Sequence, residues 1–472
     1  MKTALIITHI ALSMLAIGSI IYYGRRPSRS IGWVGAIVSL PFVGVLLYYL
    51  FGINRRKFKF FNSKEFERRR SYRRHEFFSH TTTNLHFGDD IRKQRLSNLI
   101  HASSKTRPSH GNKITVLQDG GETFNALFKA MEKAEEFIHV QYYILERGDL
   151  LDKMLDLFKR KIAEGVQIRI IYDSFGSYHL RGRPKKHFQD IGVDIHPIMP
   201  IRLNNFLFSL NFRNHRKIVV IDNKVAFTGG VNISDKYIRH KGELGKWKDT
   251  HLKMEGPIVN DIHLVFLQDY FFASKKENFQ IKDFLREQPK IGNTSAQVVA
   301  GGPDSDYPTI MQQYISMMNQ AEKCIYIANP YFLPGEAFLQ TLKIVAMEGV
   351  EINLLLPKKS DSKAAMFAMF SQFEELLKVG VNIYLRSDFS HSKLLIVDDD
   401  LVSIGSGNFD IRSFELNYEA NILMYDNSIN TEIKEEFLAL CEKSEKLTLE
   451  AFKNRSFGQK FLEGLFKFFK PL

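Results

Sequence analysis

Cysteine is nearly absent from this chain: its 472 residues contain two, Cys324 and Cys441, which lie far apart. Two distant thiols exclude a disulfide framework and a metal site built from several thiolates. Such scarcity favours a protein domain on the cytosolic side of a membrane. The other residue types that bind metals show no ligand spacing either, so we expect no metal and no cofactor.

Acidic residues are too few to balance the basic ones. The chain has 65 Lys and Arg against 52 Asp and Glu, which gives a formal net charge of +13 at pH 7. This excess favours an anionic partner, either a membrane surface rich in acidic lipid or a nucleic acid. The hydrophobic content of 44% and the charged content of 25% are ordinary for a folded protein. The length predicts two domains with additional segments.

Charged residues are missing from two long runs near the N-terminus. Residues 3–23 and 31–51 contain no Asp, Glu, Lys or Arg, and each run has about the length that a helix needs to cross the hydrocarbon core. The first run has no small-x-small cleavage site at its end, which argues against a removed signal peptide. We therefore predict a two-helix transmembrane hairpin over residues 1–54, with Pro41 tolerated inside the second span.

Basic residues cluster just beyond the second run. Nine lysines and arginines lie at positions 55–57, 59, 68–70, 73 and 74. By the positive-inside rule this cluster places the rest of the chain in the cytoplasm, although Arg25, Arg26 and Arg29 in the hairpin loop would then lie outside. We follow the larger cluster, which could also pair with anionic headgroups. The expected location is the cell membrane, with two spans, a basic linker over residues 55–112 and a cytoplasmic catalytic part.

The remainder of the chain contains one signature twice. Each copy reads H-x-K-x-x-x-x-D, followed by a glycine fourteen and an asparagine seventeen residues after the histidine. The matched residues are His215, Lys217, Asp222, Gly229 and Asn232 in the first copy and His391, Lys393, Asp398, Gly405 and Asn408 in the second. We expect about 0.1 chance match to the short signature in a chain of this kind. Two copies therefore indicate one phosphate-handling site assembled from two halves.

Short apolar runs alternate with helical stretches from about residue 113, which is typical of an α/β fold. Residues 134–143 and 321–331 also resemble each other, each a helix end running into a strand. The runs 218–221 and 394–397, directly after the two lysines, are continuously apolar, as in central strands buried on both faces. We predict two tandem domains with mixed sheets flanked by helices, related by a pseudo-two-fold, over residues 113–287 and 288–445.

The strand geometry separates the residues of each signature. A histidine and a lysine two positions apart point to the same face of a strand. Asp222 and Asp398 face the other way at the strand end, where a turn residue is expected. Both aspartates belong to the signatures and are kept among the catalytic candidates. The glycines that follow would let the backbone approach a phosphate closely.

Two histidines and two lysines at one site suit phosphodiester exchange without a metal. One neutral imidazole attacks phosphorus and forms a phosphohistidine, while the other, protonated, gives its proton to the leaving alkoxide. The lysines, with Asn232 and Asn408, would balance charge on the non-bridging oxygens. A histidine in this role needs a carboxylate on its other ring nitrogen. Asp249 and Glu419 follow the two histidines at comparable distances and are the candidates.

With these motifs the chain resembles the phospholipase D superfamily and, within it, the bacterial cardiolipin synthases, over essentially its whole length. The motifs that carry the resemblance are Arg213-Asn-His215-Arg-Lys217, Thr228-Gly-Gly-Val-Asn232, Asn329-Pro-Tyr331-Phe332 and Gly405-Ser-Gly-Asn408-Phe-Asp-Ile-Arg412-Ser-Phe-Glu-Leu-Asn417-Tyr-Glu419. The resemblance implies two phospholipase D-like domains. It also implies transfer of a phosphatidyl group from one phosphatidylglycerol to another with release of glycerol. In that reaction it favours His215 as nucleophile and His391 as general acid.

Three alternatives to a synthase stay open. A nuclease of the same superfamily would suit a basic chain, but it would not need two membrane spans, and the basic residues cluster beside the membrane rather than around the signatures. A hydrolytic phospholipase differs only in whether water or a lipid alcohol completes the cycle. A membrane scaffold with a dead site fits poorly with two intact signatures. We expect phosphatidylglycerol and anionic membrane lipids as partners and no nucleic acid; the oligomeric state is left open.

Phenylalanine is concentrated at the C-terminal end. Residues 446–472 interleave Phe457, Phe461 and several other apolar side chains with lysines. This composition suits a short amphipathic helix that lies in a membrane interface. The alternative is a terminal helix packed on the protein core.

Overall fold

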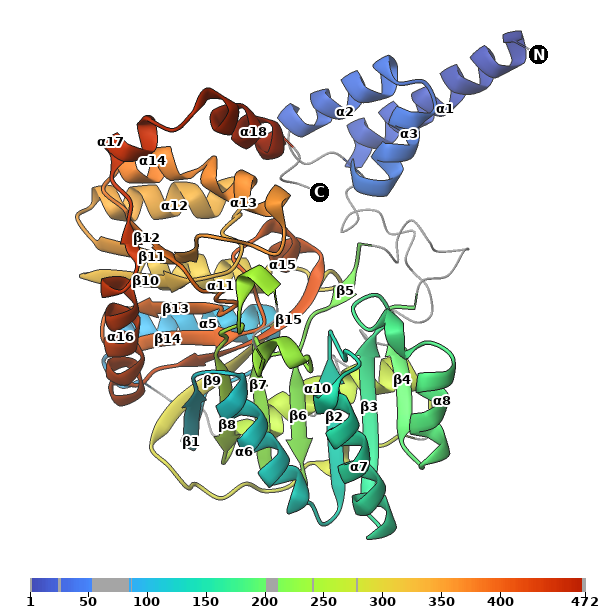
Figure 1. Ribbon diagram of the computed structural model, residues 1–472, viewed down its shortest axis with the longest axis vertical. Coiled ribbons are helices and arrows are strands. Elements are labelled where there is room, and N and C mark those ends of the chain that lie inside the picture. Colours follow the sequence, from blue (N-terminus) through green and yellow to red (C-terminus); the bar gives the residue numbers. More distant parts are fainter. Residues whose placement is uncertain are drawn as a thin grey trace.

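The computed structural model describes residues 2–23, 27–52, 85, 87–200, 211–239, 242–276 and 279–468. One 16-stranded mixed sheet runs through the body of the protein (Figure 1). Its first half has the order β1 (Ser109–Leu117), β8 (His251–Glu255), β7 (Val225–Gly229), β6 (Ile218–Ile221), β2 (Phe137–Tyr142), β3 (Gln167–Asp173) and β4 (Asp194–Ile198). Its second half has the order β9 (Thr294–Gly301), β15 (Asn417–Met424), β14 (Leu401–Gly405), β13 (Leu394–Val397), β10 (Cys324–Ala328), β11 (Glu351–Pro357), β12 (Asn382–Arg386) and β16 (Glu445–Lys446).

The two halves repeat one topology. Strands β1, β8, β7, β6, β2, β3 and β4 correspond in order to β9, β15, β14, β13, β10, β11 and β12. The pairing agrees as well: β2 is parallel to β3 and antiparallel to β6, just as β10 is parallel to β11 and antiparallel to β13. The halves join where β1 pairs antiparallel with β9. The predicted mixed α/β fold with tandem domains is confirmed.

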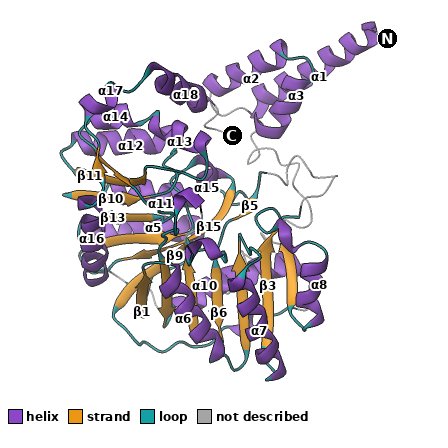
Figure 2. Cartoon of the chain, viewed as in Figure 1, coloured by secondary structure: helices purple, strands orange, loops and turns teal. Residues whose placement is uncertain are grey.

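Helices cover both faces of each half-sheet (Figure 2). In the first half, α6 (Gly120–Glu132), α7 (Asp149–Ala163) and α8 (Arg183–Asp190) pack on one face and α10 (Ile258–Ser274) on the other. In the second half, α5 (Ile91–Ser104), α11 (Thr309–Met318), α12 (Glu336–Met347) and α14 (Phe373–Lys378) pack on one face and α16 (Asn427–Glu442) on the other. The apolar runs after the signature lysines are buried on both faces: Val219 and Ile221 point into one core, and Ile218 and Val220 into another.

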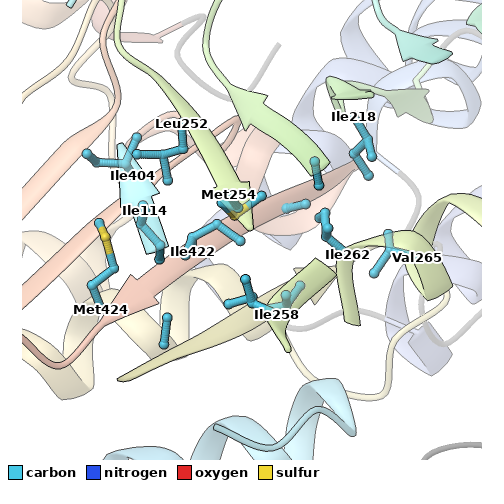
Figure 3. Close-up of a cluster of buried hydrophobic side chains, with 14 of the residues drawn as sticks. Ile114, Ile218, Leu252, Met254, Ile258, Ile262, Val265, Ile404, Ile422 and Met424 are labelled. Carbon is cyan, nitrogen blue, oxygen red and sulfur yellow. The ribbon is translucent and has the colours of Figure 1, made fainter. Parts of the chain in front are cut away.

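One hydrophobic core joins the two halves. Ile218, Leu252 and Met254 from the first half lie in the same buried cluster as Ile404 and Ile422 from the second (Figure 3). All five side chains are fully buried. Because a close-packed core resists deformation, this cluster fixes the halves relative to each other and holds the residues at their junction in place.

The C-terminal part of the predicted linker over residues 55–112 contains a packed helix. Residues 91–104, assigned to it from the sequence, form α5, on which Leu96 and Ile100 are fully buried against the second half. Asp90 caps this helix by accepting a hydrogen bond from Lys93 N at 3.1 Å. α5 therefore belongs to the folded body. The basic cluster at positions 55–74 lies outside the described residues, and the domain boundaries stay predictions.

The N-terminal segment has one helix of spanning length among the described residues. α1 (Lys2–Tyr23) contains a 21-residue apolar stretch of mean hydropathy 2.2. The second apolar run is broken: α2 (Pro27–Ser39) ends before Pro41, α3 (Val43–Leu47) starts after it, and a π-helical turn over residues 48–52 follows. Proline lacks an N–H and clashes with the preceding turn, and Phe42 has a positive φ of 61°. The predicted second span is thus not confirmed as a continuous helix.

The C-terminal tail forms two helices, α17 (Leu449–Lys453) and α18 (Phe457–Phe468). α18 packs on α13 (Lys363–Phe370), where the Phe466 ring stacks on Phe367 with centroids 5.8 Å apart. Its opposite side is exposed to solvent. One face of α18 thus packs on the protein. Only the opposite, exposed face is free to make the membrane contact predicted for the tail.

Candidate active site

The segment before the first histidine pairs with the second half. β5 (Arg213–Asn214) runs parallel to residues 417–418 at the start of β15, and His215 N donates a hydrogen bond to Tyr418 O at 2.9 Å. The next residue on β15 is Glu419, whose fully buried carboxylate lies 3.1 Å from His215 Nδ1. Backbone pairing between the halves therefore brings a carboxylate of the second half to the histidine of the first.

The second histidine is held in the same way by the first half. Ser390 forms a parallel bridge with Lys248, and His391 N donates to Lys248 O at 2.7 Å. The next residue, Asp249, is fully buried and places its Oδ2 2.8 Å from His391 Nδ1. The structure thus brings both candidate carboxylates to the histidines, but each contacts the histidine of the other half. We call these contacts the crossed pairs, His215–Glu419 and His391–Asp249.

Glycines after the signatures make room for these contacts. A Cβ on Gly230 would lie 2.0 Å from Asp249 Oδ1, and one on Gly405 would lie 2.3 Å from Asn421 Oδ1. Neither position can accept a larger residue without moving buried polar groups. Gly230 therefore accommodates Asp249 of the site, and Gly405 accommodates the buried amide of Asn421. The approach of the backbone to a phosphate stays a prediction.

Both histidines line one cavity of about 590 Å³. Polar, aromatic and apolar side chains all line this cavity. The polar and aromatic lining residues include Tyr143, Arg213, Asn232, Trp247, Tyr331, Asp361, Asn408, Asp410, Arg412 and Asn417. The apolar lining residues include Ile144, Leu333, Ala364, Ala365, Ala368, Ile411 and Phe466. A cavity with this mixed lining can hold a molecule that has both a polar headgroup and apolar parts.

The two signature lysines are fully buried beside the histidines. Lys217 Nζ donates to His215 O at 2.7 Å. Lys393 Nζ donates to His391 O and lies 2.7 Å from His391 Nδ1. Burial lowers the pKa of Lys217 to about 7 and that of Lys393 to about 8, against the opposing pull of Glu419 and Asp249, respectively. Because their charges are poorly solvated, an anion between the histidines would stabilise them.

Burial also lowers the pKa of both histidines. Glu419 partly offsets this effect at His215, whereas the positive charges of Lys393 and Lys217 depress the pKa of His391 further. The carboxylates differ as well. Burial raises the pKa of Asp249 to about 6; burial acts the same way on Glu419, but His215 and Lys217 hold its pKa below the usual range. The site without substrate thus favours two neutral imidazoles, and a phosphate anion would raise their pKa values.

The signature aspartates lie at the other end of their strands. Asp222 accepts hydrogen bonds from the three N–H groups of residues 135–137 at 2.8–2.9 Å. Asp398 does the same with residues 322–324 at 2.8–3.0 Å. Each anchors the turn after its strand to the start of β2 or β10. These contacts favour a structural role for both aspartates, in agreement with the alternation along the strand, over the catalytic role for which they were kept as candidates.

The signature asparagines line the cavity. Asn232 Oδ1 accepts from Ile144 N at 3.3 Å, and its Nδ2 donates to Tyr237 OH at 3.4 Å. Asn408 Oδ1 is buried and has no hydrogen-bond partner within the described part of the chain. A buried amide oxygen needs a donor, so Asn408 Oδ1 is suited to accept a hydrogen bond from a hydroxyl group of a bound molecule.

Several aromatic residues of the site were not among the predicted residues. The Tyr143 ring lies 4.8 Å from the His215 ring, and the Tyr331 ring 6.1 Å from the His391 ring. Each tyrosine is the last residue of one of the repeated segments, 134–143 and 321–331. Their matching positions in the repeat could therefore have marked them as candidate site residues. Tyr237 OH lies 3.3 Å from His391 Nδ1, and no repeat marks this residue.

Metal ligands are not grouped in the structure: in the described ranges, no three His, Cys, Asp or Glu side chains are placed to hold an ion. The expectation of metal-free chemistry stays a prediction.

Two like half-sheets, one shared cavity and crossed histidine–carboxylate pairs define an enzyme of the phospholipase D type. Residues 127–262 and 314–441 match the family model "Cardiolipin synthase, PLD-like domain", and residues 11–52 match the phospholipase D-nuclease N-terminal model. The chain belongs to the cardiolipin synthase family of the phospholipase D superfamily. Together with the apolar α1, the N-terminal match indicates a membrane protein.

Relatives cover nearly the full chain. A cardiolipin synthase of Alkalihalophilus pseudofirmus is 35% identical over 465 residues, which is 98% of this chain and 92% of that protein. A probable cardiolipin synthase of Bacillus subtilis shows the same identity and coverage. A crystal structure of phosphatidylserine synthase from Haemophilus influenzae superposes with a TM-score of 0.61 at 16% identity, covering 80% of this chain and 96% of that one. This last likeness shows a shared fold.

Proposed function

We propose that this enzyme converts two phosphatidylglycerol molecules into cardiolipin and glycerol through a covalent phosphohistidine. The observation that carries the proposal is the pair of buried histidines, each bound to a carboxylate of the other half, in one cavity lined in part by apolar side chains. The family relatives support cardiolipin as the product.

In the first step His215 attacks the phosphorus of the donor lipid. Glu419 accepts the hydrogen on Nδ1, which leaves the lone pair on Nε2 for the attack and stabilises the imidazolium that forms. The bond between phosphorus and the glycerol oxygen breaks, and His391 gives its proton to the departing alkoxide. The difference between the carboxylates supports these roles: Glu419 favours its ionised form, whereas Asp249, with a pKa raised to about 6 by burial, retains a proton in its pair with His391 more readily.

In the second step a hydroxyl of the acceptor phosphatidylglycerol gives its proton to His391 and attacks the phosphorus of the phosphohistidine. The bond between phosphorus and His215 Nε2 breaks, which restores the imidazole and releases cardiolipin. Lys217 and Lys393, with Asn232 and Asn408, bind the non-bridging oxygens in both steps. Replacing one phosphodiester by another changes the free energy little, so the product depends on which nucleophile reaches phosphorus. An acceptor held in place gains an effective concentration that bulk water at about 55 M cannot match. The apolar lining, which includes Leu333, supports the exclusion of water.

The proposal places the enzyme in the cell membrane, with two N-terminal spans and the catalytic body on the cytoplasmic side. The basic cluster beyond residue 54 supports this orientation through the positive-inside rule. Phosphatidylglycerol and other anionic lipids are the expected partners, and no nucleic acid is expected.

Product analysis tests the proposal. The intact enzyme, incubated with vesicles of phosphatidylglycerol alone, should yield cardiolipin and glycerol in equal amounts, with little phosphatidic acid. Phosphatidic acid as the main product would mean that water completes the cycle, and the enzyme would then be a phospholipase.

A further inference from the structure

An apolar stripe on α18 faces solvent although the helix is already packed. Phe457, Phe461 and Leu465 are spaced by four residues and are 84%, 61% and 43% exposed. We call these three residues the outer stripe. On the opposite side of the helix, Glu463 is buried and binds Arg455 at 2.9 Å. A helix on a soluble body normally presents polar residues to water, so this stripe marks a contact surface.

The exposed charges on α18 are positive. Lys460 and Lys467 lie along one edge of the outer stripe and are exposed, whereas Glu463, the acidic residue of the helix, is buried. Lys467 Nζ also lies 3.5 Å from Glu375 Oε1 on α14, in an exposed ion pair. An apolar stripe with lysines along its edge fits the interface of an anionic bilayer, where apolar rings enter the headgroup boundary and ammonium groups meet lipid phosphates. The net charge of +13 agrees with such a surface. The chemistry therefore favours an anionic lipid surface over a second copy of the chain.

The inner side of the same helix reaches the active-site cavity. Phe466 lines that cavity together with Ala364, Ala365 and Ala368 of α13. α18 is therefore a wall of the cavity on one side and an exposed apolar surface on the other. Figure 1 also shows α18 at the same end of the molecule as α1, α2 and α3. A bilayer in contact with the outer stripe would meet the protein beside the cavity.

We propose that α18 is a membrane-docking helix of the active site. Its outer stripe enters the headgroup region of an anionic bilayer, and Phe466 forms the rim over which a lipid headgroup passes to His215 and His391. The identity of that lipid as phosphatidylglycerol rests on the proposed function; the docking itself depends only on the surface of α18.

Insertion is measured with a fluorescent probe on the full chain. Phe461→Cys carries an environment-sensitive label, and the labelled protein is reconstituted into phosphatidylglycerol vesicles. The native Cys324 and Cys441 are buried, and the chain without an added cysteine gives the background. The matched control is Lys159→Cys, exposed on α7 of the first half. We expect quenchers attached to lipid chains to quench the label at position 461 and leave position 159 unquenched.

Quenching of position 461 by water-soluble quenchers to the same extent as position 159 would overturn the proposal. Burial of that label in detergent, rising with protein concentration and without lipid, would overturn it in favour of contact between two copies. Cardiolipin formation is not needed for this readout. A label that inserts in a protein that releases phosphatidic acid would leave docking intact and refute the synthase function.

A kinetic test uses the triple variant Phe457→Gln, Phe461→Gln and Leu465→Gln. These side chains face solvent, so the fold should be retained. We expect the rate on phosphatidylglycerol vesicles to fall about tenfold or more as interfacial binding weakens, with cleavage of a water-soluble short-chain phosphatidylglycerol unchanged. The matched control, Ile344→Gln with Met347→Gln, removes two exposed apolar side chains from α12, which are 50% and 66% exposed. Equal effects of both variants on the vesicle rate would contradict a specific role of α18.

Discussion

Replacing Glu419 by glutamine tests the crossed pair at the first histidine. Glutamine keeps the size of the side chain and, with its single amide oxygen, can still accept a hydrogen bond from Ser413, whose hydroxyl lies 2.9 Å from Oε1 of Glu419. It removes the negative charge beside His215. Its amide can also donate to Nδ1, which would place the imidazole hydrogen on Nε2, the atom that must attack phosphorus.

The size of the effect follows from the contact. The carboxylate lies 3.1 Å from His215 Nδ1, and Glu419 is fully buried, so solvent screens the pair little. Two unit charges about 4 Å apart interact by about 4 kcal/mol at an effective dielectric constant of about 20. Since about 1.36 kcal/mol corresponds to a factor of ten in rate, the phosphohistidine should form about 10³-fold more slowly.

Single-turnover kinetics with phosphatidylglycerol in detergent micelles measure this step, and an unchanged melting temperature excludes unfolding. Glu415→Gln, the same chemical change on the partly exposed α15 (Ile411–Glu415), is the matched control and should keep the native rate. Nitrogen-15 NMR of labelled histidine shows which ring is affected. A loss of less than tenfold, or a shift of the His391 ring signals instead of those of His215, would refute the crossed pairing.

Three further predictions concern the turn aspartates, the lysines and metals. Asp222→Ala and Asp398→Ala each leave three backbone N–H groups without their acceptor. Each variant should therefore lower the free energy of unfolding by about 2–3 kcal/mol in denaturant titrations, while the folded protein keeps its kcat. Loss of kcat at native stability would contradict a structural role. Because burial lowers the pKa of Lys217 to about 7 and of Lys393 to about 8, both lose their charge on the alkaline side of neutrality, and kcat/KM should fall as pH rises through this range; a profile that stays flat to about pH 10 would argue against charged lysines in the reaction. Treatment with EDTA should leave the rate unchanged, and complete inactivation that a divalent ion reverses would show that a metal takes part.

Local patterns in the sequence were sufficient to predict the repeat and the central strands. The spacing within each signature places His and Lys on one face of a strand. Residues 218–221 are all apolar, which predicts a strand buried on both faces, and in the structure they alternate between two cores. The same period of two indicates that Asp222 points away from the site. These predictions depend on neighbours along the chain, which the sequence contains directly.

The features that could not be predicted depend on contacts between distant segments. The crossed pairs arise because β5 pairs with β15 some 200 residues later, and the spacing from each histidine to its following carboxylate does not reveal this. α5 has no marked apolar face of its own, and its Leu96 is buried only by packing on the second half. A proline such as Pro41 can be tolerated inside a membrane span, but here the helix is interrupted between Ser39 and Val43, and Phe42 has a positive φ.

Activity of the two single-histidine variants tests the shared site most directly. His215→Asn and His391→Asn should each form cardiolipin from phosphatidylglycerol at least about 10³-fold more slowly than the native enzyme, because each removes one of two groups that act in the same turnover. A mixture of the two variants should stay inactive, since each chain would lack a residue of its only complete site. A near-native rate in either variant, or recovery of activity on mixing, would contradict a single site built from the two halves of one chain.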